Sequence, residues 1–143
     1  MVTESVIAVR YPETDPMGIV HHAVYPLWYE IGRMDWCAAV GFPYTDMQAL
    51  GINPTMVSLN LTYKAPVTYP GSVTVRTRCA AFGPRKLELH YETLRGDGVL
   101  VNTAVTFHLW TGPDNRILNL AQAQPAIYAR LREAAGPALE TLT

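Results

Sequence analysis

Two carboxylates and two histidines stand close together in a short segment that is unsuited to regular structure. Residues 12–22, PETDPMGIVHH, hold Glu13, Asp15, His21 and His22 together with two prolines and a glycine, which favour a specified turn path. A carboxylate held on an ordered loop can attack an electrophilic carbon or activate a water molecule. An aspartate before a proline is also a common structural turn former, so the residues alone leave both roles open for Asp15.

Other kinds of catalytic site find little support in the sequence. Adjacent histidines such as His21 and His22 rarely both reach one metal ion, and no cluster of cysteine or carboxylate ligands accompanies them, so we expect no metal. The chain lacks a G-x-S-x-G motif and a glycine-rich phosphate loop, which argues against a serine hydrolase and a nucleotide-hydrolysing enzyme. Eleven basic and twelve acidic residues give a net charge of -1, so we expect no nucleic-acid partner.

The candidate loop lies between an expected strand and an expected long helix. Residues 5–11, SVIAVRY, are rich in β-branched and aromatic side chains and predict a strand that stops at Pro12. Apolar residues then recur at helical spacing from about residue 23 to residue 40, where Gly41 and Pro43 supply a stop signal. The loop should therefore be held at both ends.

The rest of the chain predicts a short helix, four strands and a terminal helix. Residues 44–50 favour a short helical segment with Asp46 as its cap and Gly51 at its end. Four later segments alternate apolar and polar side chains and are joined mostly by tight turns, which is typical of consecutive antiparallel strands. The strands are expected at 57–64, 72–81, 86–95 and 99–110, and the terminal helix at 124–135.

This order of elements predicts an α+β fold in a single domain over residues 1–143. A five-stranded antiparallel sheet needs a cover for its apolar face, and the one long helix is the only element large enough to provide it. We therefore expect the sheet to wrap around a long central helix, with a further helix at the C-terminus.

Composition and signals favour a cytoplasmic protein that associates with itself. Apolar residues make up 49% and charged residues 16% of the chain, which is more apolar surface than a small monomer readily exposes. The beginning, MVTESVIAVRY, does not resemble a secretory signal, and no apolar run approaches the roughly 20 residues of a membrane span. In this setting Cys37 and Cys79 are expected to be reduced and partly buried.

Two separated motifs resemble the 4-hydroxybenzoyl-CoA thioesterase branch of the hotdog-fold superfamily. The first is VRYPETDPMGIVHHAVYPLWYE at residues 9–30, and the second is LTYKAPVTYPGSVTV at residues 61–75. The resemblance covers nearly the whole chain and implies an acyl-CoA thioesterase in which a sheet wraps around a central helix. It also implies paired subunits with active sites at the subunit boundary, in a dimer or in a homotetramer built as a dimer of dimers.

The resemblance assigns catalytic roles to two residues. The catalytic carboxylate of the branch matches Asp15, and the backbone N–H that stabilises the oxyanion falls on His22. A thioester would then be hydrolysed to a carboxylic acid and coenzyme A, with Asp15 acting as nucleophile or as general base. The leaving thiol, with a reference pKa of about 8.5, departs as a thiolate without a strong acid. No cofactor is expected, because coenzyme A is part of the substrate.

Five further residues are expected to contact the substrate. Gly18 permits backbone geometry or a close ligand approach that a side chain would block, and Val20 follows it in the G-x-V step. Tyr25 can line the acyl pocket or simply pack in the core. Arg85 and Lys86, in the turn between two strands, can meet the phosphates of coenzyme A or remain solvated.

Three alternatives stay open beside this interpretation. Glu30 lies on the long helix, where another hotdog branch carries its catalytic carboxylate, although it can also pair with Arg33 as a surface group. The fold alone would also permit a protein that binds acyl-CoA without hydrolysing it. A hotdog hydratase is the third alternative, but its aspartate and histidine motif is absent from this sequence.

Overall fold

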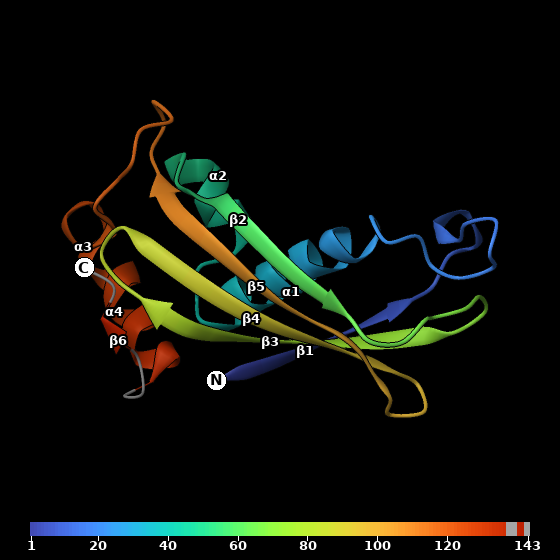
Figure 1. Ribbon diagram of the computed structural model, residues 1–143. Helices are drawn as coiled ribbons and strands as arrows, with labels where there is room; N and C mark the ends of the chain where they lie inside the picture. The colour runs from blue at the N-terminus through green and yellow to red at the C-terminus, as the bar shows by residue number, and fades with distance from the viewer. Residues whose placement is uncertain (137–139, 142–143) are drawn as a thin grey trace.

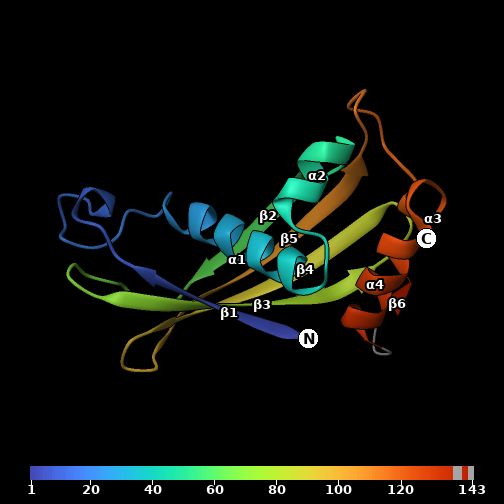
Figure 2. The same ribbon diagram turned by 180° about the vertical axis from the view of Figure 1, so that it is seen from behind.

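The computed structural model describes residues 1–136 and 140–141 and shows a curved antiparallel sheet with one long helix lying against one face (Figure 1, Figure 2). The strand order is β1-β3-β4-β5-β2, and neighbouring strands in this order run antiparallel. This arrangement confirms the predicted α+β class and the five predicted strands. The strands are β1 (Val2–Ala8), β2 (Asn53–Tyr63), β3 (Ser72–Phe82), β4 (Lys86–Arg95) and β5 (Leu100–Thr111).

The long helix α1 (Tyr25–Ala39) packs against the sheet, as the sequence predicted. Helix α2 (Tyr44–Leu50) follows it, and α3 (Leu120–Ala123) and α4 (Pro125–Ala135) lie at the end of the sheet where β3 turns into β4 (Figure 1). None of the helices in the described residues is long and apolar enough to cross a membrane.

Helix α1 can approach the sheet closely because its inner face carries a glycine. A Cβ added at Gly32 would lie 2.5 Å from Thr77 Oγ1 and 3.1 Å from Val75 Cγ1 of β3. On both sides of this contact the helix buries large aromatic rings against the sheet, and this apolar burial is the main stabilising contribution to the core. The buried aromatic residues of α1 are Tyr25, Trp28, Tyr29 and Trp36.

The first strand and the long helix differ slightly from their predicted bounds. Strand β1 occupies residues 2–8 rather than 5–11, because its partner β3 begins at Ser72, which pairs with Ala8. Beyond this pair, Val9 N donates to Gly71 O, and the chain then leaves the sheet at the turn that starts with Tyr11. The predicted loop after it contains one 3-10 turn, η1 (Tyr11–Glu13). Helix α1 begins at residue 25 rather than 23, with Pro26 in its first turn, where a missing N–H costs little.

Two other expectations need correction, and two short elements were not predicted. Asp46 does not cap α2, because Pro43 occupies the N-cap and Asp46 lies inside the first turn. Strand β2 begins at Asn53, four residues before the predicted start, because a proline such as Pro54 is tolerated in an edge strand. The short helix α3 and a two-residue strand β6 (Glu140–Thr141), which pairs with β3 in parallel, were not predicted.

A chain of polar side chains crosses the core between the sheet and α1. His108 is fully buried; its Nδ1 lies 3.1 Å from the carbonyl oxygen of Pro54, and its Nε2 lies 2.7 Å from Thr106 Oγ1. A carbonyl can only accept, so Nδ1 carries the proton and Nε2 accepts from Thr106. Burial, and then the charge of Arg33, lower the pKa of His108 to about 4. The imidazole is therefore neutral in the folded protein.

The neutral His108 makes folding sensitive to acid. Its pKa rises from about 4 in the folded state to about 6.5 in the unfolded state, so the unfolded chain takes up the proton first. The associated stability is complete above about pH 6.5 and is lost as the pH falls towards 4. Between pH 7 and pH 4.5 we expect this group to remove about 2 kcal/mol from the free energy of unfolding.

Urea unfolding at the two pH values measures this loss. The His108→Gln variant, which keeps a donor and an acceptor but no titratable ring, should lose about 2 kcal/mol less than the wild type over the same interval. The control is His90→Gln, which also removes one imidazole but at a different position, on β4, where the ring is hydrogen-bonded to Glu88. An equal pH dependence in the wild type and His108→Gln would contradict the assignment.

Candidate active site

The carboxylate of Glu13 ties the first loop to the start of the long helix. Glu13 is only 7% exposed, and its side chain accepts hydrogen bonds from Arg10 N at 2.7 Å and from Trp28 Nε1 at 3.0 Å. Its backbone carbonyl accepts from His21 N at 2.8 Å. The loop between β1 and α1 is therefore closed on itself and held against the helix.

A second set of backbone bonds shapes the turn that carries Asp15. Asp15 N donates to Ile19 O at 2.8 Å, and Gly18 N donates to Asp15 O at 2.9 Å. Gly18 has φ of +78°, in the left-handed region that favours glycine. The structure thus agrees with the predicted backbone role of Gly18.

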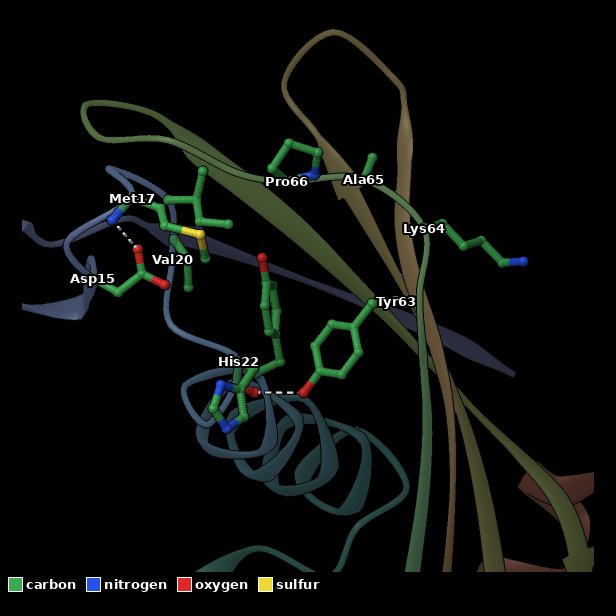
Figure 3. A pocket seen from close by; sticks show the side chains of 10 residues that line it. Asp15, Met17, Val20, His22, Tyr63, Lys64, Ala65 and Pro66 are labelled. Carbon is green, nitrogen blue, oxygen red and sulfur yellow. Dashed lines mark hydrogen bonds between the residues drawn. The ribbon is translucent and has the colours of Figure 1, made fainter.

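The loop docks on the connection between β2 and β3. Val20 N donates to Val67 O at 2.8 Å, and Ile19 forms an isolated bridge with Thr68. Between the loop and the end of β2 lies an open cavity of about 480 Å³ with largely apolar walls (Figure 3). Its walls are formed by Asp15, Met17, Ile19, Val20, His22, Tyr25, Tyr63, Lys64, Ala65 and Pro66.

The side chain of Asp15 closes a local turn and also lies at the cavity. Its Oδ1 accepts a hydrogen bond from Met17 N at 2.8 Å, which closes a local turn, while Oδ2 has no hydrogen-bond partner among the described residues. The side chain is half-buried and lies in the wall of the cavity. One carboxylate oxygen is therefore structural and the other is available to a ligand.

The backbone N–H of His22 has no acceptor within the described residues. The carbonyl of the same peptide unit, His21 O, accepts from Val24 N at 3.0 Å. In a trans peptide the C=O and the N–H point in opposite directions, so the N–H of His22 points away from Val24. Because α1 begins at Tyr25, this N–H belongs to the turn before the helix rather than to its first residue.

Two tyrosines form part of the cavity wall. Tyr25 is buried, and its ring meets Trp28 and Tyr63 edge-on, with centroids 5.2 Å and 5.8 Å apart. Burial, with a smaller effect from Tyr63, raises the pKa of Tyr25 to about 12. Its hydroxyl therefore stays protonated at neutral pH, and Tyr25 serves both as core and as pocket wall.

Three of the predicted substrate-binding residues do not line this cavity. Gly18 shapes the turn without being part of the wall. Arg85 and Lys86 lie where β3 turns into β4, at the opposite end of the sheet (Figure 1). Lys86 pairs with Leu109 of β5 whereas the cavity residue Tyr63 pairs with Asn102, and the seven steps along the strand from 102 to 109 span roughly 23 Å.

Glu30 lies beside a different hollow. Its carboxylate accepts from Arg33 Nη2 at 3.3 Å, as a surface pair would, while the side chain of Arg33 is only 9% exposed. Both residues line a hollow of about 330 Å³ between α1, α2 and the start of β2. Glu30 therefore lines a different hollow from the one that Asp15 lines.

Several wall residues were not predicted as site residues. They are Met17, Ile19, Tyr63, Lys64, Ala65 and Pro66. Residues 63–66 belong to the second motif, LTYKAPVTYPG. The motif could not be placed at the site from the sequence, because the strand register is needed to bring it next to the loop.

The structure gives no metal site among residues 1–136 and 140–141, since no three His, Cys, Asp or Glu side chains gather there. The rings of His21 and His22 stack on each other with centroids 4.1 Å apart. Cys37 and Cys79 are both free, as expected, and they are buried rather than partly buried; this burial raises the pKa of each thiol to about 12.

Comparison with known proteins agrees with this architecture. Residues 9–131 match the family model of the thioesterase-like superfamily. A putative acyl-CoA thioesterase, YneP, from Bacillus subtilis (strain 168) is 36% identical over 108 residues, which are 76% of this chain and 78% of that protein.

Solved structures show the same fold. A DHNA-CoA thioesterase from Staphylococcus aureus superposes with a TM-score of 0.88 at 29% identity, over 92% of this chain and 89% of its own. The hypothetical protein TT1821 from Thermus thermophilus superposes with a TM-score of 0.86 at 35% identity, over 96% of this chain and 100% of its own. This chain therefore belongs to the thioesterase-like superfamily and is a thioesterase with the hotdog fold.

Proposed function

We propose that this protein hydrolyses acyl-CoA thioesters to a carboxylic acid and coenzyme A, with Asp15 as the catalytic carboxylate and the N–H of His22 as the oxyanion donor. The observation that carries the proposal is that Asp15 and His22 line one cavity and that each of them has an unused polar group. Asp15 Oδ2 has no partner in the described chain, and neither has the N–H of His22. The names of the relatives from Bacillus subtilis and Staphylococcus aureus support the same substrate class.

The two groups match the charge changes of thioester hydrolysis. Negative charge develops on the carbonyl oxygen, and a donor already held in place stabilises that charge without reorganising during the reaction. Asp15 either attacks the carbonyl carbon, giving a mixed anhydride that water then cleaves, or removes a proton from the attacking water. The coenzyme A thiolate leaves without a general acid, and the reaction requires no cofactor.

The walls of the cavity suit an acyl group better than the polar part of coenzyme A. Ile19, Val20, Tyr25 and Pro66 present mostly apolar surface, and a volume of about 480 Å³ is in the usual range for a small-molecule site. In this proposal the acyl chain enters the cavity and the coenzyme A remains near the opening. Arg85 and Lys86, at the far end of the sheet, would then meet the phosphates only of a substrate bound to another subunit.

A homo-oligomer formed through β2 would bring a second subunit to this site. Strand β2 is an edge of the sheet and, within residues 1–136 and 140–141, pairs with β5 alone; Val57 on it is 56% exposed. Leu27 and Ile31 of α1 are also exposed. An 11-residue edge strand with exposed apolar side chains is prone to pair with another strand, and antiparallel pairing with its own copy would place its start beside the end of the partner's β2.

Substitution of Asp15 tests the catalytic assignment. In Asp15→Asn the amide oxygen can still accept from Met17 N, so the turn is kept while the negative charge is lost. We expect kcat for thiol release from acyl-CoA substrates to fall by about 10² or more, since the variant has neither a carboxylate nucleophile nor a base. Steady-state thiol release across acyl groups of different length and aromatic character measures this.

Glu30→Gln is the matched control, because it removes a carboxylate from the neighbouring hollow. It should retain most of the wild-type activity. Full activity in Asp15→Asn, or loss of activity only in Glu30→Gln, would contradict the assignment. A wild type that binds acyl-CoA but releases no thiol would instead favour the non-hydrolysing binding protein.

Charge placed on the exposed edge tests the assembly. Val57→Lys should weaken association, because antiparallel pairing of two copies of β2 would bring like charges near each other. Val6→Lys, on the opposite edge strand β1 at a position that is 75% exposed, should leave the assembly unchanged. Sedimentation velocity distinguishes the species. A monomeric wild type, or dissociation by Val6→Lys alone, would refute the proposed interface.

A further inference from the structure

One hydrogen bond connects the sheet to the turn that holds the proposed oxyanion donor. The hydroxyl of Tyr63, the last residue of β2, donates to His22 O at 2.6 Å (Figure 3). The two residues are 41 positions apart in the chain. Within the part of the chain that the structure describes, Tyr63 is the only residue outside the loop and α1 that donates a hydrogen bond to this carbonyl.

The peptide groups on both sides of the His22 Cα are anchored. Before it, the carbonyl of His21 accepts from Val24 N. After it, His22 O accepts from Tyr63, and the N–H of Ala23 donates to His21 Nδ1 at 3.0 Å. The hydrogen bonds within residues 21–24 define the shape of the turn, but they do not fix the position of the turn relative to the sheet. Tyr63 ties the turn to a strand of the sheet.

The ring of Tyr63 is itself held in place. It packs edge-on against Tyr25, and the backbone of Tyr63 pairs with Asn102 on β5. Asn102 is fully buried and accepts a hydrogen bond from the hydroxyl of Tyr29 on α1. The Tyr63 hydroxyl therefore projects from a rigid part of the fold, while its half-exposed ring also forms part of the cavity wall.

We propose that Tyr63 is a positioning residue for thioester hydrolysis, whose hydroxyl holds the His22 carbonyl so that the His22 N–H stays directed at the substrate oxygen. The inference rests on the proposed function. An oxyanion donor is effective because its orientation is set before the reaction, so loosening the anchor should reduce transition-state stabilisation more than ground-state binding. Tyr63 acts on the donor and exchanges no proton with the substrate.

Tyr63→Phe removes the hydroxyl and keeps the ring that packs on Tyr25. Loss of one neutral hydrogen bond should lower kcat about 3- to 10-fold, with KM changed by less than about twofold. Tyr128→Phe is the matched control, because its hydroxyl on α4 makes no hydrogen bond within the described residues and its ring stacks on Phe82 away from the cavity. The control should keep the kcat and KM of the wild type.

A second measurement separates positioning from a general loss of structure. In amide hydrogen exchange followed by NMR, the N–H of Ala23 should exchange faster in Tyr63→Phe than in the wild type, because His22 O and the Ala23 N–H belong to one peptide group, which loses its anchor to β2 and can rotate away from His21 Nδ1. Tyr128→Phe should leave that rate unchanged. Thermal unfolding and sedimentation velocity should show the same fold and assembly for all three proteins.

The outcomes distinguish this inference from the function on which it rests. An active wild type with an equally active Tyr63→Phe would overturn the role of Tyr63 and leave the proposed function standing. A kcat loss without faster exchange at Ala23, or a loss expressed only in KM, would likewise overturn positioning. A wild type that releases no thiol from any acyl-CoA would overturn the proposed function and this inference together.

Discussion

The buried carboxylate of Glu13 is the constraint on which the rest of the site depends. It receives hydrogen bonds from the backbone after β1 and from a tryptophan of α1, while the carbonyl of the same residue holds His21. A buried carboxylate is costly unless it is hydrogen-bonded, so the three segments satisfy one another. The loop consequently has a defined path from β1 to α1, and Asp15 and His22 are brought to one cavity.

The proposed site is assembled from two parts of the chain with different structural roles. The loop supplies the carboxylate and the unpaired N–H, while the end of β2 supplies a wall and the hydroxyl of Tyr63. Because β2 is also an edge strand of the sheet, contact with a second subunit at this edge would act on the same strand that, in our proposal, holds the turn. Assembly and catalysis are thereby linked in the proposed function through one structural element.

Sequence patterns predicted the elements well wherever local signals decide the structure. The alternation in 86–95 and the turns on both sides predicted β4 with its observed bounds. The start of β2 was missed, because a proline such as Pro54 normally interrupts a strand and is tolerated only at the edge of a sheet. The place of Tyr63 in the cavity wall and the distance of Arg85 from the cavity both depend on the register in which the strands pair. That register is a long-range property which no short segment encodes.

The most direct test of the account is a crystal structure with a substrate analogue in which a methylene group replaces the thioester sulfur, so that the carbonyl is kept and cannot be hydrolysed. The account predicts that the carbonyl oxygen lies within about 3 Å of His22 N and that Asp15 Oδ2 faces the carbonyl carbon or a water beside it. A carbonyl bound against Glu30, with His22 N turned to solvent, would contradict it.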